Sequence, residues 1–228
     1  MKKALVGLVG AAALATLTTG MAAASSSMNA DQSSSNNAAG IFISGNLGYG
    51  TVNNSKSDIN YTYLLGAQPN TLHNTGFAWN ANIGYQFNKN VAIEGGYTHF
   101  GEQKATWTNI GSDNISLSGF GVDAKFIIPV NDQFSVFAKG GAIDMHQKNQ
   151  ASGNLTGTVT GSAWTPEVGA GVAYNVTQNV ALNLQDIYTL KTDYNKTVTP
   201  VGGVATNDQF IIPSTNSIFL GASYKFNM

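Results

Sequence analysis

Large apolar side chains alternate with small or polar side chains along much of the chain beyond residue 40. In the segment from Phe77 to Phe87 the odd positions are mostly large and apolar, whereas the even positions are Ala78, Asn80, Asn82, Gly84 and Gln86. A side-chain period of two is that of a β-strand with two different faces. The same alternation recurs and predicts eight strands, near residues 41–49, 77–87, 91–97, 120–128, 134–136, 168–174, 180–184 and 218–226.

The connections between the predicted strands are of two kinds, which alternate along the chain. Three are short and rich in turn-forming residues, at 88–90, 130–133 and 175–179. Four are long and rich in Asn, Ser, Thr and Gly, at about 51–74, 101–113, 147–161 and 192–214. Short periplasmic turns and long outer loops are typical of barrels in bacterial outer membranes. The pattern therefore predicts an all-β fold, an eight-stranded antiparallel up-and-down transmembrane β-barrel.

The second face of the predicted strands distinguishes a membrane barrel from a soluble one. A soluble barrel of about eight strands points its large apolar residues inward around a ligand and its other face into water. Here that other face would carry mainly Asn, Gln, Gly and Ser and almost no charge, which is a poor water-facing surface. We therefore expect the large apolar face to contact lipid. Aromatic girdles near the strand ends are expected from Trp79, Tyr85, Phe87, Tyr174, Tyr224 and Phe226.

Six charged residues fall on the small, polar face of the predicted strands, and we expect them inside the barrel. They are three acids and three lysines, which can neutralise one another there: Glu94, Asp123, Lys125, Lys139, Glu167 and Lys225. Such a set forms either a charged conduit or a structural plug, and the narrow lumen of an eight-stranded barrel favours the plug. Asp186 does not fit, because it lies on the lipid face of its strand. Either a β-bulge turns the strand over at this point or the register differs from the one predicted.

Composition excludes several other functions. Only 10% of the 228 residues are charged, against about 25% in an ordinary soluble domain. The chain has no arginine and a net charge of −1, which argues against a nucleic-acid-binding protein, since these need a basic surface. It has no cysteine, and its three histidines, His73, His99 and His146, lack metal-binding spacing. We therefore expect no metal, no cofactor and no nucleic-acid partner.

The N-terminal segment has the features of a bacterial secretory signal peptide. Lys2 and Lys3 precede a short apolar run, and a small-residue cleavage site follows at Ala22-Ala23-Ala24. The run is shorter than the ~20 residues that span a bilayer comfortably. We expect cleavage of residues 1–24, a disordered polar leader over residues 25–39, and a barrel over residues 40–228.

Two segments resemble a known superfamily of small barrels. The segment Gly84-Tyr-Gln-Phe-Asn-Lys-Asn-Val-Ala-Ile-Glu-Gly-Gly-Tyr-Thr-His-Phe100 is similar to the second hairpin of the outer-membrane-protein-A-like, or opacity-protein-like, transmembrane barrels. The terminal Gly221-Ala-Ser-Tyr-Lys-Phe226 resembles their last strand, which ends on an aromatic residue. The resemblance implies a location in the outer membrane, with outer-membrane lipid and the barrel assembly machinery as partners. Small members are adhesins, serum-resistance factors and structural proteins, and a few are lipid-modifying enzymes.

These observations favour a function without catalysis. We expect a monomeric structural barrel that presents four long surface loops for adhesion or another surface interaction, with apolar loop residues at Tyr61, Tyr63, Leu64, Leu65, Trp107 and Val201. The alternative is a narrow, low-conductance channel. An enzyme is less favoured. The lipid-modifying deacylases of the barrel type that the chain resembles use a His-x-Ser pair. The nearest match here, His73-Asn-Thr75, has the wrong hydroxyl, so we expect no catalytic residues.

Overall fold

The computed structural model describes residues 39–54, 68–153, 157–198 and 206–226, and most of them form β-strands. None of these residues belongs to a helix long and apolar enough to cross a membrane. The strands are β1 (Gly40–Val52), β2 (Thr71–His73), β3 (Thr75–Gln86), β4 (Val91–Trp107), β5 (Gly111–Pro129), β6 (Phe134–Gly153), β7 (Gly157–Asn175), β8 (Val180–Thr189), β9 (Thr192–Val198), β10 (Thr206–Ile212) and β11 (Thr215–Lys225).

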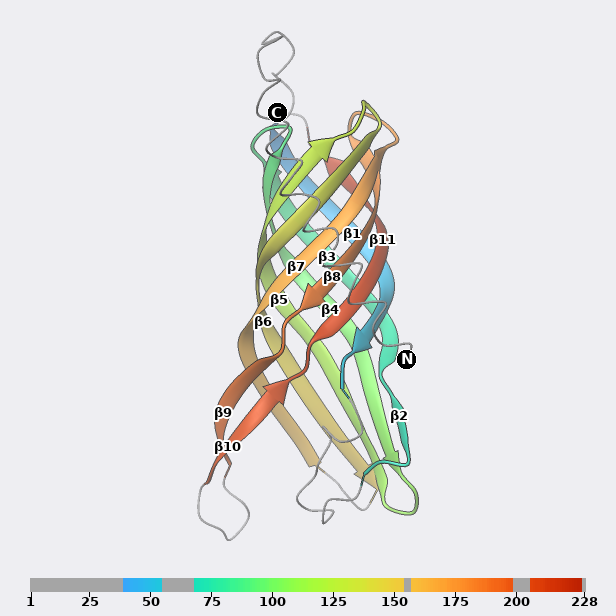
Figure 1. Ribbon diagram of the computed structural model, residues 1–228, viewed down its shortest axis with the longest axis vertical. Coiled ribbons are helices and arrows are strands. Elements are labelled where there is room, and N and C mark those ends of the chain that lie inside the picture. Colours follow the sequence, from blue (N-terminus) through green and yellow to red (C-terminus); the bar gives the residue numbers. More distant parts are fainter. Residues whose placement is uncertain (1–38, 55–67, 154–156, 199–205, 227–228) are drawn as a thin grey trace.

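Eight of the strands close into the antiparallel barrel that the alternation predicts (Figure 1). Around the barrel they follow the order β1, β3, β4, β5, β6, β7, β8 and β11, and β11 pairs with β1 to complete the circle. The short strand β2 pairs with the far end of β4, and β9 and β10 form a separate two-stranded ribbon. Closure pairs the backbone groups of the wall with one another, which a bilayer requires because hydrocarbon offers no hydrogen bonds.

The side chains alternate between the outside and the inside of the barrel. On the outside, Phe120, Trp164 and Leu220 are 65%, 64% and 64% exposed. Their neighbours Thr165 and Phe219 point the other way and are fully buried. A monomeric soluble protein rarely exposes an apolar surface this extensive. The outer face is therefore suited to hydrocarbon, as the sequence pattern predicts.

The three predicted short turns lie together at one end of the barrel, the upper end in Figure 1. In the first of them, Asn88 Oδ1 accepts hydrogen bonds from the backbone N–H groups of Asn90 and Val91, at 2.8 and 2.9 Å. Asn131 and Thr177 accept equivalent bonds in the other two turns. These local bonds explain why Asn and Thr are placed there, because a short polar side chain can replace a backbone acceptor in a tight turn.

Three of the four predicted long loops are wrong. Residues 192–214 contain β9 and β10, which form the separate two-stranded ribbon. Residues 101–113 and 147–161 lie mostly in strands, since β4 runs to Trp107, β6 runs to Gly153 and β7 begins at Gly157. The far ends of these strands carry polar residues on their outer faces, so the alternation that identifies a lipid-facing strand disappears there. The strands β4, β5, β6 and β7 are 17 to 20 residues long, which is longer than the alternation predicts. They project beyond the rest of the barrel at its lower end in Figure 1.

Neither of the two explanations offered for Asp186 holds, because the strand has no β-bulge there and its register is the predicted one. The pairing of β8 with both neighbours is continuous through Asp186, so this residue stays on the outer face. There its Oδ2 accepts a hydrogen bond from Asn216 Nδ2 at 3.4 Å. A bulge lies instead in β4, where the register shifts between His99 and Glu102 and Gly101 has a φ of 97°.

Some predictions fall outside the described residues. These are the signal peptide at 1–24, the leader at 25–39 except for its last residue, and the loop residues Tyr61, Tyr63, Leu64, Leu65 and Val201. Trp107, predicted as an apolar loop residue, is described and differs from the expectation. It ends β4, is only 2% exposed and packs in a small cluster with Leu72, Ala105 and Ile110.

Candidate functional site

The inside of the barrel consists of three layers that follow one another along its axis. The inward-facing residues of β6 pass through all three in order. Ser135 and Phe137 line an open cavity near the turns, Lys139 belongs to a set of ion pairs, and Ile143 and Met145 belong to an apolar cluster. We call these layers the vestibule, the charged layer and the apolar plug.

The charged layer consists of Glu94, Asp123, Lys125, Lys139 and Glu167. Its three acids lie in one row: Glu94 on β4 is opposite Asp123 on β5, and the next two positions in that row are Gly141 on β6 and Glu167 on β7. The two lysines face each other on β5 and β6, one row nearer the turns. The β-sheet register therefore places a row of negative charge directly beside a row of positive charge.

Lys139 is the centre of the ion pairs. Its Nζ lies 2.9 Å from Asp123 Oδ2 and 3.0 Å from Glu94 Oε1. Lys125 Nζ lies 3.5 Å from Glu94 Oε2 and 4.0 Å from the centroid of the Phe137 ring, where a cation–π contact adds to the ion pair. The side chains of Lys139 and Glu94 are 4% and 3% exposed. Burial this complete costs free energy that only close pairing offsets, so the two rows depend on each other.

Glycines in the middle of the strands make room for the carboxylates. A Cβ atom on Gly141 would lie 2.5 Å from Asp123 Oδ1 and 1.9 Å from the carbonyl oxygen of Val122. A Cβ atom on Gly121 would lie 2.7 Å from Glu167 Oε1. Both positions therefore need glycine because another group approaches closely, which is a common reason for glycine inside a strand.

The apolar plug fills the lumen on the far side of the charged layer. Three of its members, Leu117, Ile143 and Phe219, are fully buried and come from β5, β6 and β11. The complete cluster is Val52, Ala78, Phe100, Ile115, Leu117, Ile143, Met145, Ile187, Ile212 and Phe219. The bulge in β4 contributes to it, because it turns Phe100 into the barrel. The interior of the barrel is therefore closed by packed side chains at this level.

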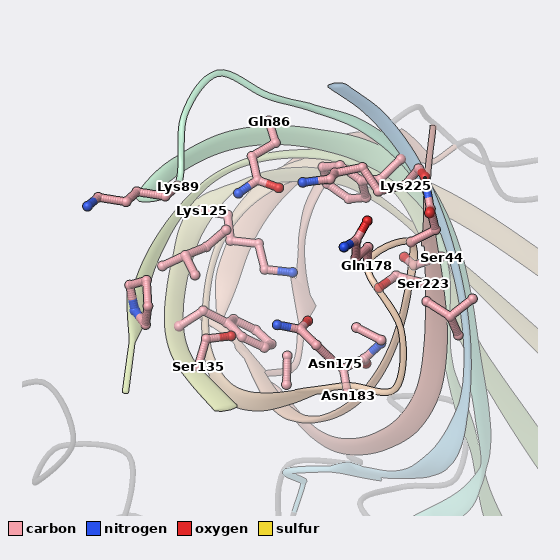
Figure 2. Close-up of a pocket in the computed structure, with 18 of the residues that line it drawn as sticks. Ser44, Gln86, Lys89, Lys125, Ser135, Asn175, Gln178, Asn183, Ser223 and Lys225 are labelled. Atoms are coloured by element: carbon pink, nitrogen blue, oxygen red, sulfur yellow. Dashed lines mark hydrogen bonds between the residues drawn. The ribbon is translucent and has the colours of Figure 1, made fainter. Parts of the chain in front are cut away.

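The vestibule lies between the charged layer and the turns, and Figure 2 shows it from the side of the turns. Its volume is about 510 Å³, and Lys125 and Glu94 of the charged layer are among the residues that line it. Carboxamides and hydroxyls make up most of its polar lining. Gln86, Gln178 and Asn183 carry their amides towards its centre in Figure 2.

The sixth predicted interior charge, Lys225, lies in a different layer from the other five. It lines the vestibule near the end of β11, and its ammonium group points into the cavity in Figure 2. The six residues predicted as aromatic girdles lie on the outer face, and all but Trp79 are near the turns. Pairs of rings contact each other there, with centroids 5.1 Å apart for Tyr85 and Phe87 and 4.9 Å apart for Tyr224 and Phe226.

The three histidines lie on different strands of the described part of the chain. His99 and His146 lie on the outer face of β4 and β6, and His73 lies in β2. His146 Nδ1 is 3.1 Å from the carbonyl oxygen of Asp144, two residues away. No group of three or more His, Cys, Asp or Glu side chains among the described residues could hold a metal ion.

Sequence analysis missed the apolar plug. It assigned small and polar residues to the inner face, but Ile143, Ile187 and Phe219 occupy that face too. A signal was present at Ile218-Phe219-Leu220, where three large apolar residues in a row place one of them inside the barrel. Such a run means that a strand is apolar on both faces.

A closed antiparallel barrel with an apolar exterior and ion pairs in its interior defines a β-barrel protein of the bacterial outer membrane. The sequence profile of the outer membrane protein beta-barrel domain matches residues 8–226, and the chain belongs to this family. Among curated proteins the chain is similar to an uncharacterized protein of Coxiella burnetii. The two are 27% identical over 263 aligned residues, which cover 99% of this chain and 100% of the relative.

Solved structures share the fold at low sequence identity. The outer membrane protein OprG from Pseudomonas aeruginosa matches with a TM-score of 0.58 at 14% identity, over 83% of this chain and 97% of that one. Neisserial surface protein A matches with a TM-score of 0.54 at 17% identity, over 82% and 99%. The outer membrane protein AlkL matches with a TM-score of 0.55 at 18% identity, over 87% and 95%. The chain is thus an outer-membrane barrel of a fold that these proteins share.

Proposed function

We propose that this protein is a non-conducting, non-enzymatic barrel that presents a projecting β-sheet to the exterior of the cell for adhesion. In outer-membrane barrels the short turns face the periplasm, so the long ends of β4 to β7 face outwards. The observation that carries the proposal is the contrast between the two ends of the molecule. The lumen is filled by the charged layer and the apolar plug, whereas the four longest strands project beyond it.

The projecting sheet has a chemically suitable surface for contact with another protein. Above the apolar band its outer face carries hydroxyls, amides and a few charges, including Ser118, His146 and Ser162 side by side on β5, β6 and β7. This surface is polar, so it is compatible with water outside the membrane. It has few charges, so electrostatic repulsion does not prevent contact with a partner.

One edge of the projecting sheet forms no ladder with a described strand, although β9 passes close to β7. β7 pairs with β8 only from Glu167 to Asn175, and no described strand pairs with that side of β7 between Gly161 and Pro166. Leu190 N donates to Pro166 O at 3.0 Å, so even-numbered residues of β7 direct their backbone groups to this side. The N–H and C=O groups of Ser162 and Trp164 therefore face this edge. An edge of this kind binds an extended segment of another protein by adding it as a strand.

The decisive experiment compares adhesion with the edge intact and blocked. Bacteria that express the chain are tested for binding to cultured epithelial monolayers, beside cells that carry the empty vector. Ser162→Pro removes the N–H group at the edge without removing a bond to β6, whereas Ser162→Thr keeps it and serves as the matched control. We expect binding by the wild type and the Thr variant and its loss in the Pro variant. Equal binding by all strains, including the vector control, would contradict the proposal.

The alternative function is a narrow channel, and conductance recording distinguishes it from the proposed adhesion. Purified, refolded protein in planar lipid bilayers is expected to give no steady ohmic openings, because Phe219 and its neighbours fill the lumen. Openings of reproducible conductance from pure protein would favour the channel. An enzymatic function would instead appear as altered lipid acylation in cells that express the chain.

A further inference from the structure

The vestibule opens at the end of the barrel that carries the short turns, which is the periplasmic end, and adhesion outside the cell does not use it. We infer that it is a binding site for a small, uncharged saccharide that enters from the periplasm. Its volume of about 510 Å³ falls within the ~300–1,000 Å³ range of ligand pockets. The inference is independent of the proposed adhesion, because the two sites lie at opposite ends of the molecule.

The lining of the vestibule is rich in carboxamides. Nine carboxamide and four hydroxyl side chains are among the 25 residues that line it. Ligand pockets are ordinarily lined mainly by apolar residues, with a small number of polar groups. A carboxamide offers both a donor and an acceptor, as does each hydroxyl of a saccharide, so the two match group by group. Phe42, Phe137 and Ile127 supply the apolar part of the wall, against which the C–H face of a sugar ring can pack.

Several of these carboxamides have no partner within the described protein. Gln86, Gln178, Asn183 and Gln185 make no side-chain hydrogen bond with another described residue. Two of them are deeply placed, since Asn183 is 8% exposed and Gln185 is 4% exposed. Buried polar groups are normally paired, so the amides of Asn183 and Gln185 indicate a polar occupant of the vestibule.

The charge balance distinguishes a neutral ligand from an ion. The vestibule and the charged layer together hold four lysines, Lys89, Lys125, Lys139 and Lys225, and four acids, Glu94, Asp123, Asp132 and Glu167. Lys89 points away from the cavity in Figure 2, and Lys125 is paired with Glu94. The ammonium group of Lys225 points into the cavity, but the formal charges of the two layers cancel. We therefore expect recognition to rest on the amides.

The test is isothermal titration of the refolded mature chain in detergent micelles with maltose, with N,N′-diacetylchitobiose and with sodium phosphate. We expect at least one of the two disaccharides to bind and phosphate to give no saturable heat. Gln178 lies in an exposed turn, so Gln178→Ala leaves the barrel intact, while Asn183→Leu fills the wall between Ala173 and Gly221. Each variant is expected to weaken saccharide binding by about three- to tenfold, the equivalent of one hydrogen bond.

Thr165→Val is the matched control, because Thr165 is also inside the barrel but lies in its closed outer half. It is expected to bind saccharide like the wild type. Retained folding of every variant is checked by its heat-modifiable migration on gels. The inference is overturned if neither disaccharide binds folded wild-type protein, if phosphate alone binds, or if Gln178→Ala and Asn183→Leu bind saccharide as tightly as Thr165→Val does. None of these results bears on adhesion, which is measured on the opposite face.

Discussion

The ammonium group of Lys139 on β6 reaches across β5 to lie 3.0 Å from the carboxylate of Glu94 on β4. The two residues are 45 positions apart, and the strand between them contributes Asp123 to the same ion-pair group. A contact between strands that are not neighbours is possible only because the barrel curves their inner faces towards one another.

Removing Lys139 is expected to destabilise the barrel strongly. Lys139→Met leaves Glu94 and Asp123 without their main partner in a buried layer, at a cost of about 3–5 kcal/mol in the free energy of unfolding. Combining it with Glu94→Gln and Asp123→Asn is expected to cost less than the sum of the separate changes, because the removed charges were compensating one another. Urea titration of folding into lipid vesicles measures all the variants, and strictly additive losses would show that these residues do not act as one network.

The glycine of the acidic row is expected to be irreplaceable. In Gly141→Ala the new methyl group would lie 1.9 Å from the backbone oxygen of Val122 and 2.5 Å from Asp123, so the sheet must shift locally. We expect a loss of about 1–3 kcal/mol or a failure to fold. The control is Gly45→Ala on β1, since nothing lies within 4 Å of the added atom there. Equal stability of the two variants in the same vesicle assay would contradict this account.

The apolar plug predicts that one phenylalanine inside the barrel matters more than one outside. Phe219→Ala opens a cavity in a fully buried cluster and is expected to cost about 3–5 kcal/mol. Phe120→Ala is the control, because Phe120 is 65% exposed on the outer face and lipid can fill the space it leaves. The difference between the two is read from unfolding midpoints in vesicles, and an equal loss would mean that the inner cluster is not tightly packed.

Asp186 is expected to be a local weakness of the lipid-facing surface. Its flanking outer-face positions, Leu184 and Tyr188, are apolar, and the bond to Asn216 at 3.4 Å is long. Asp186→Leu together with Asn216→Leu should therefore raise the free energy of unfolding in vesicles, by about 1 kcal/mol, since acids on the lipid face are mildly unfavourable. A clear loss of stability in the double variant would show that the polar pair has a structural role.

The fold class and the two faces of the barrel wall can be read from the amino-acid sequence alone. The side-chain period of two reports directly whether a residue points in or out, so Trp79 and Phe87 could be placed outside and Glu94, Asp123 and Lys139 inside without any structure. The three short turns were equally readable, because Asn88, Asn131 and Thr177 act on neighbours only two or three residues away. Side-chain direction and turn position depend on residues close together in the chain, so the sequence pattern is sufficient to predict them.

Only the tertiary structure decided where residues lie along the barrel axis and which of them meet. Alternation is the same at every height, so it could not separate Lys225 in the vestibule from Lys139 in the charged layer, or either from Phe219 in the plug. The alternation also placed the ends of two strands too early, at residues 101 and 147. Beyond these residues the outer face becomes polar, although the strands continue. Height depends on register and on the curvature of the closed sheet, and these arise from pairings between residues far apart in the chain, such as Asp123 with Gly141 and Gly141 with Glu167.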